Sequence, residues 1–500
     1  MTPGVLYGVG LGPGDPELVT VKAARLIAAA DVVAYHSARH GRSIARAIAE
    51  PYLRDGQIEE QLVYPVTTES TAHPGGYEGA INDFYADAAG RLMAHLEAGR
   101  DVVLLAEGDP LFFSSYMHMH KRIGARFETV IVPGVTSVSA ASAALAAPLV
   151  EGEDVLTVLP GTLPPDELAE RLRGTQAAAI MKVSRHFAGV QDALKRAGRL
   201  EDAYYVERAS REGQRIAPVA EVDPSSVPYM AIVIVPGREA AQAPVSAAPA
   251  AAGAGRVDVV GLGPGGRDWL TPQAQAVLAA ADHLVGYGPY LDRVPPNPRQ
   301  QRHASDNRVE SERAEFALDL ARRGARVAVV SSGDPGVFAM AAAVLEVAAE
   351  ARYADVPVTV VPGVTAAQAV ASQAGAPLGH DYAVISLSDR LKPWEIVATR
   401  LEAAARADLA IAIYNPASQS RRAQLVEARE VLLRRRAPGT PVVVGRAVGS
   451  PDQQVTVTTL GDLDVEAIDM RCLLIIGSSQ TQVAPSTGRV FTPRRYPSPS

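Results

Sequence analysis

Two glycine-rich segments are the first residues whose types and spacing could bind a phosphate or a nucleotide. They are Gly8-Val-Gly-Leu-Gly-Pro-Gly14 and Gly261-Leu-Gly-Pro-Gly265, and each follows an apolar run. The spacing departs from the GxGxxG pattern of dinucleotide loops, and Pro13 has no N–H to offer a pyrophosphate. Asp31 precedes its predicted strand, whereas a ribose-binding acid follows one. These features disfavour NAD(P), although a nucleotide-dependent oxidoreductase remains an alternative.

A repeated Gly-Asp-Pro motif places one carboxylate after an apolar run in two parts of the chain. Gly108-Asp-Pro110 follows VVLLA, and Gly333-Asp-Pro335 follows VAVVS. Open α/β sheets bind ligands at the carboxyl ends of their strands. The carboxylate could bond a ribose or an amine, or it could cap the next helix. Its repetition in the same context favours ligand binding.

A third motif repeats as Val132-Pro-Gly-Val-Thr136 and Val361-Pro-Gly-Val-Thr365, each before a helical stretch of small residues. The three motifs keep their order, with offsets of 251, 225 and 229 residues, so the chain is a tandem duplication. The change from 251 to 225 predicts about 26 extra residues in the first copy. Turn-forming residues place this insert near residues 64–77.

The elements that position these motifs follow from alternating β-branched runs and Ala-rich helical stretches, which predict a largely parallel α/β sheet. In the first copy the expected strands of this sheet are 5–10, 32–35, 102–106 and 130–132. A second set of strands follows in each copy: 155–159, 178–183, 203–207 and 231–235, then 383–387, 409–414, 441–445 and 472–476. We therefore expect two α/β lobes in each copy, with a cofactor cleft between them.

The composition limits the class of protein. A hydrophobic fraction of 47% and a charged fraction of 21% are typical of a folded globular chain, and the net charge of -7 disfavours nucleic-acid binding. The single Cys472 excludes an intrachain disulfide and a Cys-based metal site. The start of the chain does not read as a signal peptide, and no stretch reads as a membrane span, so we expect a cytoplasmic protein without a resident metal. The predicted domains are residues 1–239 and 256–480, with an Ala/Pro linker at 240–255 and a flexible tail at 481–500.

This series of motifs, continued by Met181-Lys182 and Tyr414-Asn415-Pro416, resembles the tetrapyrrole (corrin/porphyrin) methyltransferase family along both copies. The first copy, with His73-Pro-Gly-Gly-Tyr-Glu78, is similar to precorrin-2 C20-methyltransferases. The second, with Ser305-Asp-Asn-Arg308, is similar to precorrin-3B C17-methyltransferases. The resemblance implies a bifunctional S-adenosylmethionine-dependent C-methyltransferase of cobalamin (corrin) biosynthesis, the second activity including ring contraction. In an alternative, one copy is active and the other is a degenerate scaffold.

The resemblance also implies which residues hold the methyl donor. In the first copy they are Pro13, Glu107, Gly108, Asp109, Phe112, Thr136, Ser137, Met181 and Ala209. In the second copy they are Pro264, Ser332, Gly333, Asp334, Val337, Thr365, Ala366, Tyr414 and Ala447. The substrate would be a small-molecule precorrin rich in carboxylates, for which the candidate partners are Arg185, Arg208, Arg390 and Arg446. No general base is assigned, and we expect no nucleic-acid or membrane partner, and either a homodimer or an intramolecular pseudo-dimer.

Overall fold

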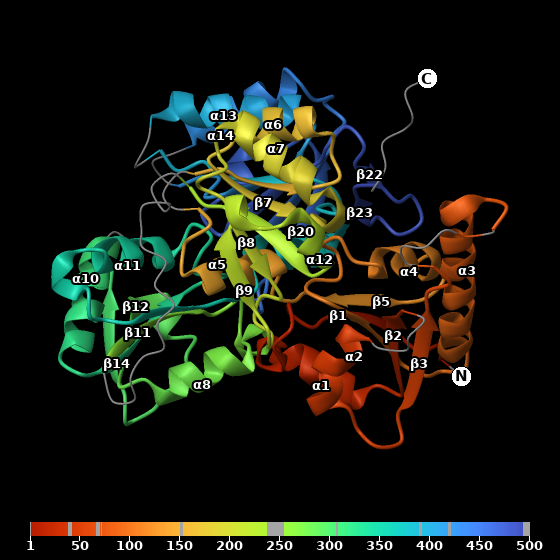
Figure 1. Ribbon diagram of the computed structural model, residues 1–500, viewed down its shortest axis with the longest axis horizontal. Helices are drawn as coiled ribbons and strands as arrows, with labels where there is room; N and C mark the ends of the chain where they lie inside the picture. Colours follow the sequence, from red (N-terminus) through yellow and green to blue (C-terminus); the bar gives the residue numbers. More distant parts are fainter. Residues whose placement is uncertain are drawn as a thin grey trace.

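The computed structural model describes residues 2–38, 43–66, 71, 73–150, 154–237, 255–306, 309–389, 393–418 and 422–493. In Figure 1 two smaller lobes lie at the lower right and lower left, below a larger shared lobe. The lower lobes are the amino-terminal parts of the two copies, and the upper lobe contains both carboxyl-terminal parts. The predicted α/β class and the two sheets per copy are confirmed.

The amino-terminal lobe of the first copy contains a parallel five-stranded sheet in the order β3-β2-β4-β1-β5. The strands are β1 (Leu6–Gly10), β2 (Val32–Ser37), β3 (Ile58–Val63), β4 (Val102–Ala106) and β5 (Thr129–Val132). Its helices are α1 (Val21–Ala29), α2 (Ile44–Ala49), α3 (Gly76–Glu97) and α4 (Tyr116–Ile123). All five residues of β4 are buried, as the apolar run predicts for a strand covered on both faces.

The amino-terminal lobe of the second copy repeats this order as β13-β12-β14-β11-β15, again with parallel pairing. Its strands are β11 (Arg256–Gly261), β12 (His283–Tyr287), β13 (Gln301–Ser305), β14 (Arg326–Ser331) and β15 (Val358–Val361). Its helices are α8 (Pro272–Ala280), α9 (Gly288–Leu291), α10 (Glu310–Arg322) and α11 (Met340–Ala348). The equal topology confirms the duplication.

The extra residues of the first copy are divided between two places. β2 and β12 begin 251 residues apart, whereas β3 and β13 begin 243 apart, so eight extra residues precede β3. The rest lie between β3 and the Gly-Asp-Pro motif, where α3 has 22 residues and α10 has 13. The insert therefore extends beyond the turn-rich segment in which we expected it, because α3 is itself lengthened.

The carboxyl-terminal lobes of the two copies share one ten-stranded sheet, whereas we expected a separate sheet in each copy. Antiparallel pairing of β6 with β17 joins them, with Val158 opposite Tyr382 and Leu156 opposite Val384. The order is β20-β19-β21-β18-β17-β6-β7-β10-β8-β9. The first copy supplies β6 (Leu156–Pro160), β7 (Ala177–Met181), β8 (Tyr204–Glu207), β9 (Arg215–Pro218) and β10 (Ala231–Val235). The second copy supplies β17 (Tyr382–Ser386), β18 (Ala410–Tyr414), β19 (Pro441–Arg446), β20 (Gln454–Thr459) and β21 (Cys472–Ile476).

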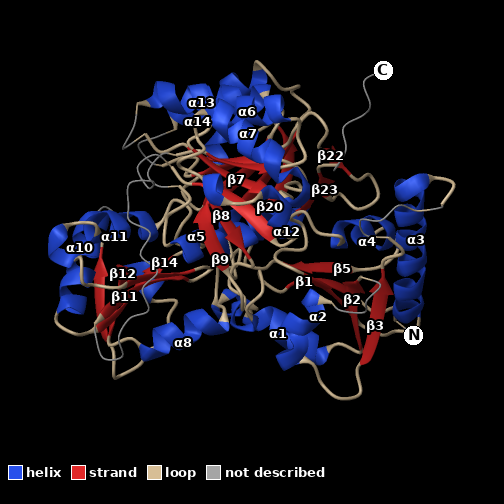
Figure 2. Cartoon of the chain, in the orientation of Figure 1, coloured by secondary structure: helices blue, strands red, loops and turns tan. Residues whose placement is uncertain are grey.

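Helices cover both faces of this shared sheet (Figure 2). The outer face carries α6 (Pro165–Arg173), α7 (Phe187–Ala197), α13 (Trp394–Arg406) and α14 (Ala423–Leu433). The inner face carries α5 (Ser137–Leu145) and α12 (Ala366–Ala374), the two small-residue helices. One continuous apolar core joins α5, α12 and the sheet across both copies.

The carboxyl-terminal segment folds back onto both copies. β22 (Gln482–Val483) and β23 (Val490–Phe491) form a hairpin, and β23 pairs with β16 (Gly375–Ala376). The Lys121 ammonium of the first copy lies 5.3 Å from the centre of the Phe491 ring. The expected flexible tail therefore cannot begin at residue 481. Of the predicted linker, only Gly255 lies within the described residues.

Among the described residues, no helix is both long enough and apolar enough to cross a membrane.

Candidate functional site

Three loops of the first copy meet at the carboxyl edge of its amino-terminal sheet. Gly12 and Gly108 exchange two backbone hydrogen bonds of 3.3 and 2.8 Å. A Cβ on Gly10 would lie 2.6 Å from the nitrogen of Gly134, so this approach requires glycine. Gly12 and Gly108 both have positive φ, which glycine adopts without strain. The glycine loop, the Gly-Asp-Pro loop and the Pro-Gly-Val-Thr loop are therefore held together by their backbones.

The second copy repeats this arrangement. Gly263 and Gly333 exchange backbone hydrogen bonds of 3.1 and 2.9 Å, and both have positive φ. A Cβ on Gly261 would lie 2.8 Å from the nitrogen of Gly363 and 2.8 Å from the carbonyl oxygen of Gly333. The repeated glycines thus have the same structural reason in both copies.

The carboxylate of the Gly-Asp-Pro motif ties two of these loops together. Asp109 Oδ1 accepts the N–H of Leu111 at 2.9 Å, and its Oδ2 accepts the N–H of Gly134 at 3.1 Å. In the second copy, Asp334 accepts the N–H groups of Gly336 and Gly363 at the same two distances. Both carboxylates are buried. Each oxygen already has a backbone donor, so the geometry favours a loop-holding role over the ligand contact that we expected.

Burial also changes the protonation of these groups. It raises the pKa of Asp109 to about 7 and that of Asp334 to about 6, and the backbone N–H donors oppose the shift. The site therefore contains a carboxyl group in each copy that titrates well above the ordinary aspartate range.

A loop from the carboxyl-terminal lobe closes over each glycine loop. In the first copy, the N–H of Asp15 donates to Ser210 Oγ at 3.3 Å, next to Ala209. In the second copy, the N–H of Gly266 donates to the carbonyl oxygen of Gly449 at 3.2 Å. Each site therefore lies where the two lobes of one copy meet, as the sequence predicted.

A guanidinium reaches the glycine loop from a different lobe in each copy. In the first copy, Arg211 of the carboxyl-terminal lobe lies against Gly14, and its charge lowers the raised pKa of Glu107. In the second copy, Arg293 of the amino-terminal lobe donates to Ser332 Oγ at 3.0 Å. It also donates to the carbonyl oxygens of Leu262, Gly263 and Gly265. Glu107 and Ser332 occupy equivalent positions, so the first site contains an acid where the second has a hydroxyl.

Backbone strain gathers at these loops. Non-glycine residues with φ near +50° recur at equivalent positions, as in the pairs Phe113 and Phe338, and Lys182 and Asn415. Ser210 and Ala447 also lie in this left-handed region, within the lobe-closing loops. Such residues cost of order 1–3 kcal/mol each and are concentrated at functional sites. This strain supports a functional reading of both sites.

Both sites border one apolar region at the seam between the copies. A cavity of about 20 Å³, room for about one water molecule, lies between α5 and β6 of the first copy and α12, β17 and β18 of the second. Gln368 donates to the hydroxyl of Tyr382 at 3.1 Å, and the Tyr414 hydroxyl accepts the N–H of Ala367 at 3.1 Å. The Phe112 ring lies 5.7 Å from that of Tyr382. Each donor-side loop therefore packs on residues of the other copy.

The structure places the predicted donor-site residues around these loops. Pro13 and Pro264 lie in the glycine loops, Thr136 and Thr365 cap α5 and α12, and Ser137 begins α5. The same apolar region holds a further group of them: Phe112, Met181, Ala209, Val337, Ala366 and Tyr414. Ala447 lies in the lobe-closing loop of the second copy.

The predicted substrate arginines are less uniform. Arg208 lies half exposed, 3.6 Å from Glu207, and Arg185 lies in the turn after β7. Arg446 already pairs with Asp469 at 2.9 Å. Arg390 lies outside the described residues. Sequence reasoning missed Arg293, Gln368 and Tyr382, because none of them belongs to a repeated motif.

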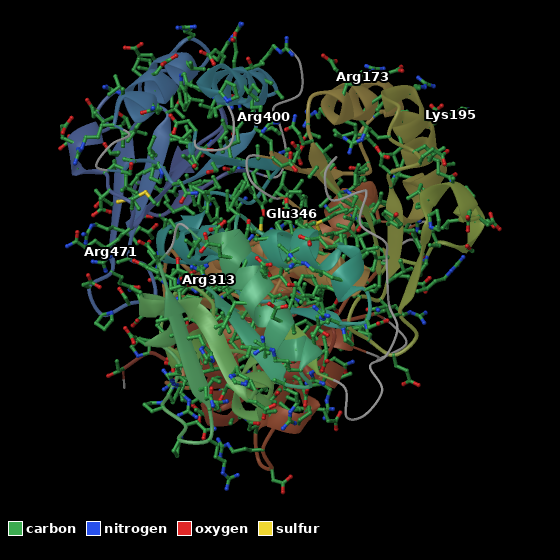
Figure 3. All side chains as sticks on the ribbon, turned by 90° about the vertical axis from the view of Figure 1, so that its left-hand side faces the viewer. Arg173, Lys195, Arg313, Glu346, Arg400 and Arg471 are labelled. Atoms are coloured by element: carbon green, nitrogen blue, oxygen red, sulfur yellow. The ribbon has the colours of Figure 1, made fainter. Side chains whose placement is uncertain are left out.

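A larger cavity of about 540 Å³ lies elsewhere, between α6 and α13 on the outer side of the shared sheet. Arg171 and Arg400 line it, and Arg400 is labelled in Figure 3 between the two groups of outer helices. None of the predicted donor-site residues lines it. Among the described residues, no group of three His, Cys, Asp or Glu side chains could hold a metal ion.

Two lobes closing on an apolar site, twice in one chain, are the architecture of a two-site transferase. The family model of Tetrapyrrole (Corrin/Porphyrin) Methylases matches residues 5–223 and 256–464. The chain belongs to this family, and it is an S-adenosylmethionine-dependent methyltransferase with two activities.

Known relatives match the whole chain and each half. Cobalamin biosynthesis protein CobIJ of Mycobacterium tuberculosis is 62% identical over 500 residues, which cover 99% of this chain and 96% of that protein. Precorrin-2 C(20)-methyltransferase of Sinorhizobium sp is 48% identical over 47% of this chain and 96% of its own length. Precorrin-3B C(17)-methyltransferase of Sinorhizobium sp is 49% identical over 48% of this chain and 97% of its own length. The solved structure of the methyltransferase CobJ is 46% identical, with a TM-score of 0.47, over 48% of this chain and 100% of that one.

Proposed function

We propose that the first copy methylates precorrin-2 at C20 and that the second methylates precorrin-3B at C17 with ring contraction, two steps of cobalamin biosynthesis. The observation that carries this proposal is the separate likeness of the two halves to single enzymes with these two activities, at 48% and 49% identity. The domains would be residues 1–239 and 256–480, as the repeat predicts.

The residues of each site fit the proposed donor. S-adenosylmethionine, when bound, supplies a methyl group on a positively charged sulfur. A site for it needs close backbone approach and few competing cations, and the glycine loops and the shared apolar region offer both. Phe112, Val337 and Tyr414 would exclude water from the reacting centre, which strengthens positioning interactions there. Asp109 and Asp334 would act indirectly, by holding the loops in place.

The substrate would be an acidic macrocycle between the lobes. Arg185 and Arg208 would accept its carboxylates in the first site, since both lie in or beside the carboxyl-terminal lobe's closing loops. In the second site, Arg446 would have to exchange Asp469 for a substrate carboxylate. Arg390 remains a candidate from the sequence.

Both copies would be active. Each retains the backbone pairing of the glycine and Gly-Asp-Pro loops and the buried carboxylate that holds them. A degenerate scaffold would have no need to keep these glycines or this strain. The pairing of β6 with β17 supports an intramolecular pseudo-dimer over a requirement for a second chain.

The test is a titration of the full chain with S-adenosylhomocysteine, together with methylation assays on precorrin-2 and precorrin-3B. We expect two bound molecules per chain and one methyl group added to each substrate. One bound molecule per chain would identify a degenerate copy. Thermal stabilisation by NAD(P) but not by S-adenosylhomocysteine would instead support the oxidoreductase alternative.

A further inference from the structure

An aromatic cluster in the first copy has no role in the account given so far. It consists of His36, Tyr64, Phe84, Tyr85 and His118, and we call it the aromatic cluster. The rings of His36 and Tyr64 are stacked 5.3 Å apart, and those of Tyr85 and His118 are stacked 4.2 Å apart. The Phe84 ring joins the two pairs, 4.8 Å from Tyr64 and 5.3 Å from Tyr85.

The aromatic cluster lies at the ligand-binding edge of the sheet. His36 is near the end of β2, and Tyr64 directly follows β3. Since β2 and β3 run parallel to β1 and β4, these residues share an edge with the glycine and Gly-Asp-Pro loops. His36, Tyr64, Phe84 and His118 are only partly buried, so the cluster keeps an accessible side.

The polar atoms of the aromatic cluster mostly satisfy one another. The Tyr64 and Tyr85 hydroxyls both donate to Ser115 Oγ, at 2.6 and 3.3 Å. Burial lowers the pKa of His36 to about 4, so its ring is neutral at pH 7. Arg122 is the nearby cation, 5.7 Å from the Tyr85 ring, and it also donates to the carbonyl oxygen of His118 at 3.2 Å. The cluster therefore offers ring faces and edges rather than a carboxylate-binding fork.

A second aromatic side chain faces this edge from the other lobe. Tyr229 is 80% exposed, in the loop before β10. The N–H of Arg208 donates to the carbonyl oxygen of Met230, which places this loop beside the one that closes on Asp15. Burial raises the pKa of Tyr64, and the hydroxyls of Tyr85 and Tyr229 raise it further, so Tyr229 lies within electrostatic range of the cluster.

The second copy lacks this arrangement. The repeat offsets make Tyr287 the counterpart of His36, Glu310 that of Tyr85, and Met470 that of Tyr229. Met470 is 48% exposed, so the position before the last strand presents an apolar side chain in both copies. Arg313, labelled in Figure 3, lies buried in this region and donates to Ser305 Oγ at 2.8 Å. A guanidinium thus lies in the part of the second lobe where the first has stacked rings.

We propose that the aromatic cluster and Tyr229 form the two sides of an aromatic clamp that binds the conjugated face of the first substrate. This clamp would distinguish the first site from the second, whose corresponding surface presents Met470 and no aromatic cluster. The inference rests on the proposed function and adds the surface that selects the macrocycle. Arginines would hold the peripheral carboxylates, while the clamp would hold the ring itself.

The test uses Tyr229→Ala in the full chain, because this exposed side chain can be removed without loss of core packing. Aromatic contacts of this kind are worth about 0.5–1.5 kcal/mol beyond area burial, so we expect KM for precorrin-2 to rise about threefold to tenfold. Tyr229→Phe should retain the wild-type KM, because the ring and not the hydroxyl makes the contact. The affinity for S-adenosylhomocysteine and the methylation of precorrin-3B should not change.

Phe316→Ala is the matched control, since it removes an exposed ring from α10 of the second copy. Met470→Ala should raise KM for precorrin-3B alone. Binding of precorrin-2 without donor, followed by its absorbance change, gives a second readout. An unchanged KM in Tyr229→Ala, or equal changes in both reactions, would overturn the clamp. If the wild-type chain does not methylate precorrin-2, the proposed function fails instead.

Discussion

The ammonium of Lys182 lies 4.5 Å from the centre of the Phe113 ring. Lys182 follows β7 in the carboxyl-terminal lobe, and Phe113 follows the Gly-Asp-Pro motif in the amino-terminal lobe, so this contact spans the first site. In the second copy, Phe338 contacts Tyr414 instead, with ring centres 5.4 Å apart. The same phenylalanine position thus closes both sites through different partners.

Lys182→Met should weaken donor binding in the first site only. A cation–π contact is worth about 0.5–2 kcal/mol, so the Kd of that site for S-adenosylhomocysteine should rise about twofold to thirtyfold. Calorimetry on the full chain measures both sites together. Lys195→Met, at the exposed end of α7, is the control and should change neither Kd. Equal weakening of both sites would contradict a local role.

Gly10→Ala should abolish the first activity and leave the second. The new Cβ would lie 2.6 Å from the nitrogen of Gly134, so two loops must separate. Methylation assays on the two substrates distinguish the sites. Gly90→Ala is the control, because nothing lies within 4 Å of a Cβ there, in the exposed face of α3. It should stabilise the chain by roughly 0.5–1 kcal/mol. Retention of the first activity in Gly10→Ala would refute the loop contact.

Asp109→Asn should lose donor binding in the first site, because one of the two backbone N–H groups loses its acceptor. Such a loss costs about 1–3 kcal/mol. The folded pKa of Asp109 is about 7, whereas an unfolded aspartate titrates near about 4. The folded state therefore holds this proton more tightly, and wild-type stability falls as the pH rises from about 4 to about 7.

The thermal midpoint of Asp109→Asn should consequently lie furthest below that of the wild type near pH 4, and the gap should narrow towards pH 7. Thermal scans of both proteins across this range measure the gap. A gap that widens with rising pH would mean that burial does not dominate the titration of this carboxyl group.

Arg293→Lys should impair the second site alone. The guanidinium of Arg293 donates to Ser332 and to carbonyl oxygens of the glycine loop, and an ammonium cannot reproduce that planar set of donors. We expect the Kd of the second site for S-adenosylhomocysteine to rise about tenfold or more, as hydrogen bonds to charged groups are worth about 1.5–3 kcal/mol. Arg299→Lys, on the exposed surface nearby, should have no effect. A response of the first site would exclude this assignment.

The sequence predicted the strands that are apolar throughout, such as β4 and β21, whose bounds match the expectation. It missed β9 and β20, because these edge strands are polar and largely exposed. It also could not predict the pairing of β6 with β17, since no pattern within a strand specifies its neighbour in another copy. Repeated motifs located both sites.

The chemical roles within the sites were harder to predict. The motif placed Asp109 near a ligand, but its backbone partners come from a loop 25 residues away, and only coordinates show that both oxygens are engaged. Arg211 and Arg293 were not paired by the repeat, because they reach equivalent loops from different lobes. Such convergence leaves no spacing signature.

The shared ten-stranded sheet means that the covalent connection between the copies is not what holds them in register. A protease that cut the chain between Gly237 and Gly255 would leave two fragments still joined by the ladder from Leu156 to Val384 and by the common apolar interior. One gene could thus be replaced by two without altering the particle, and fusion would chiefly guarantee equal amounts of its two parts.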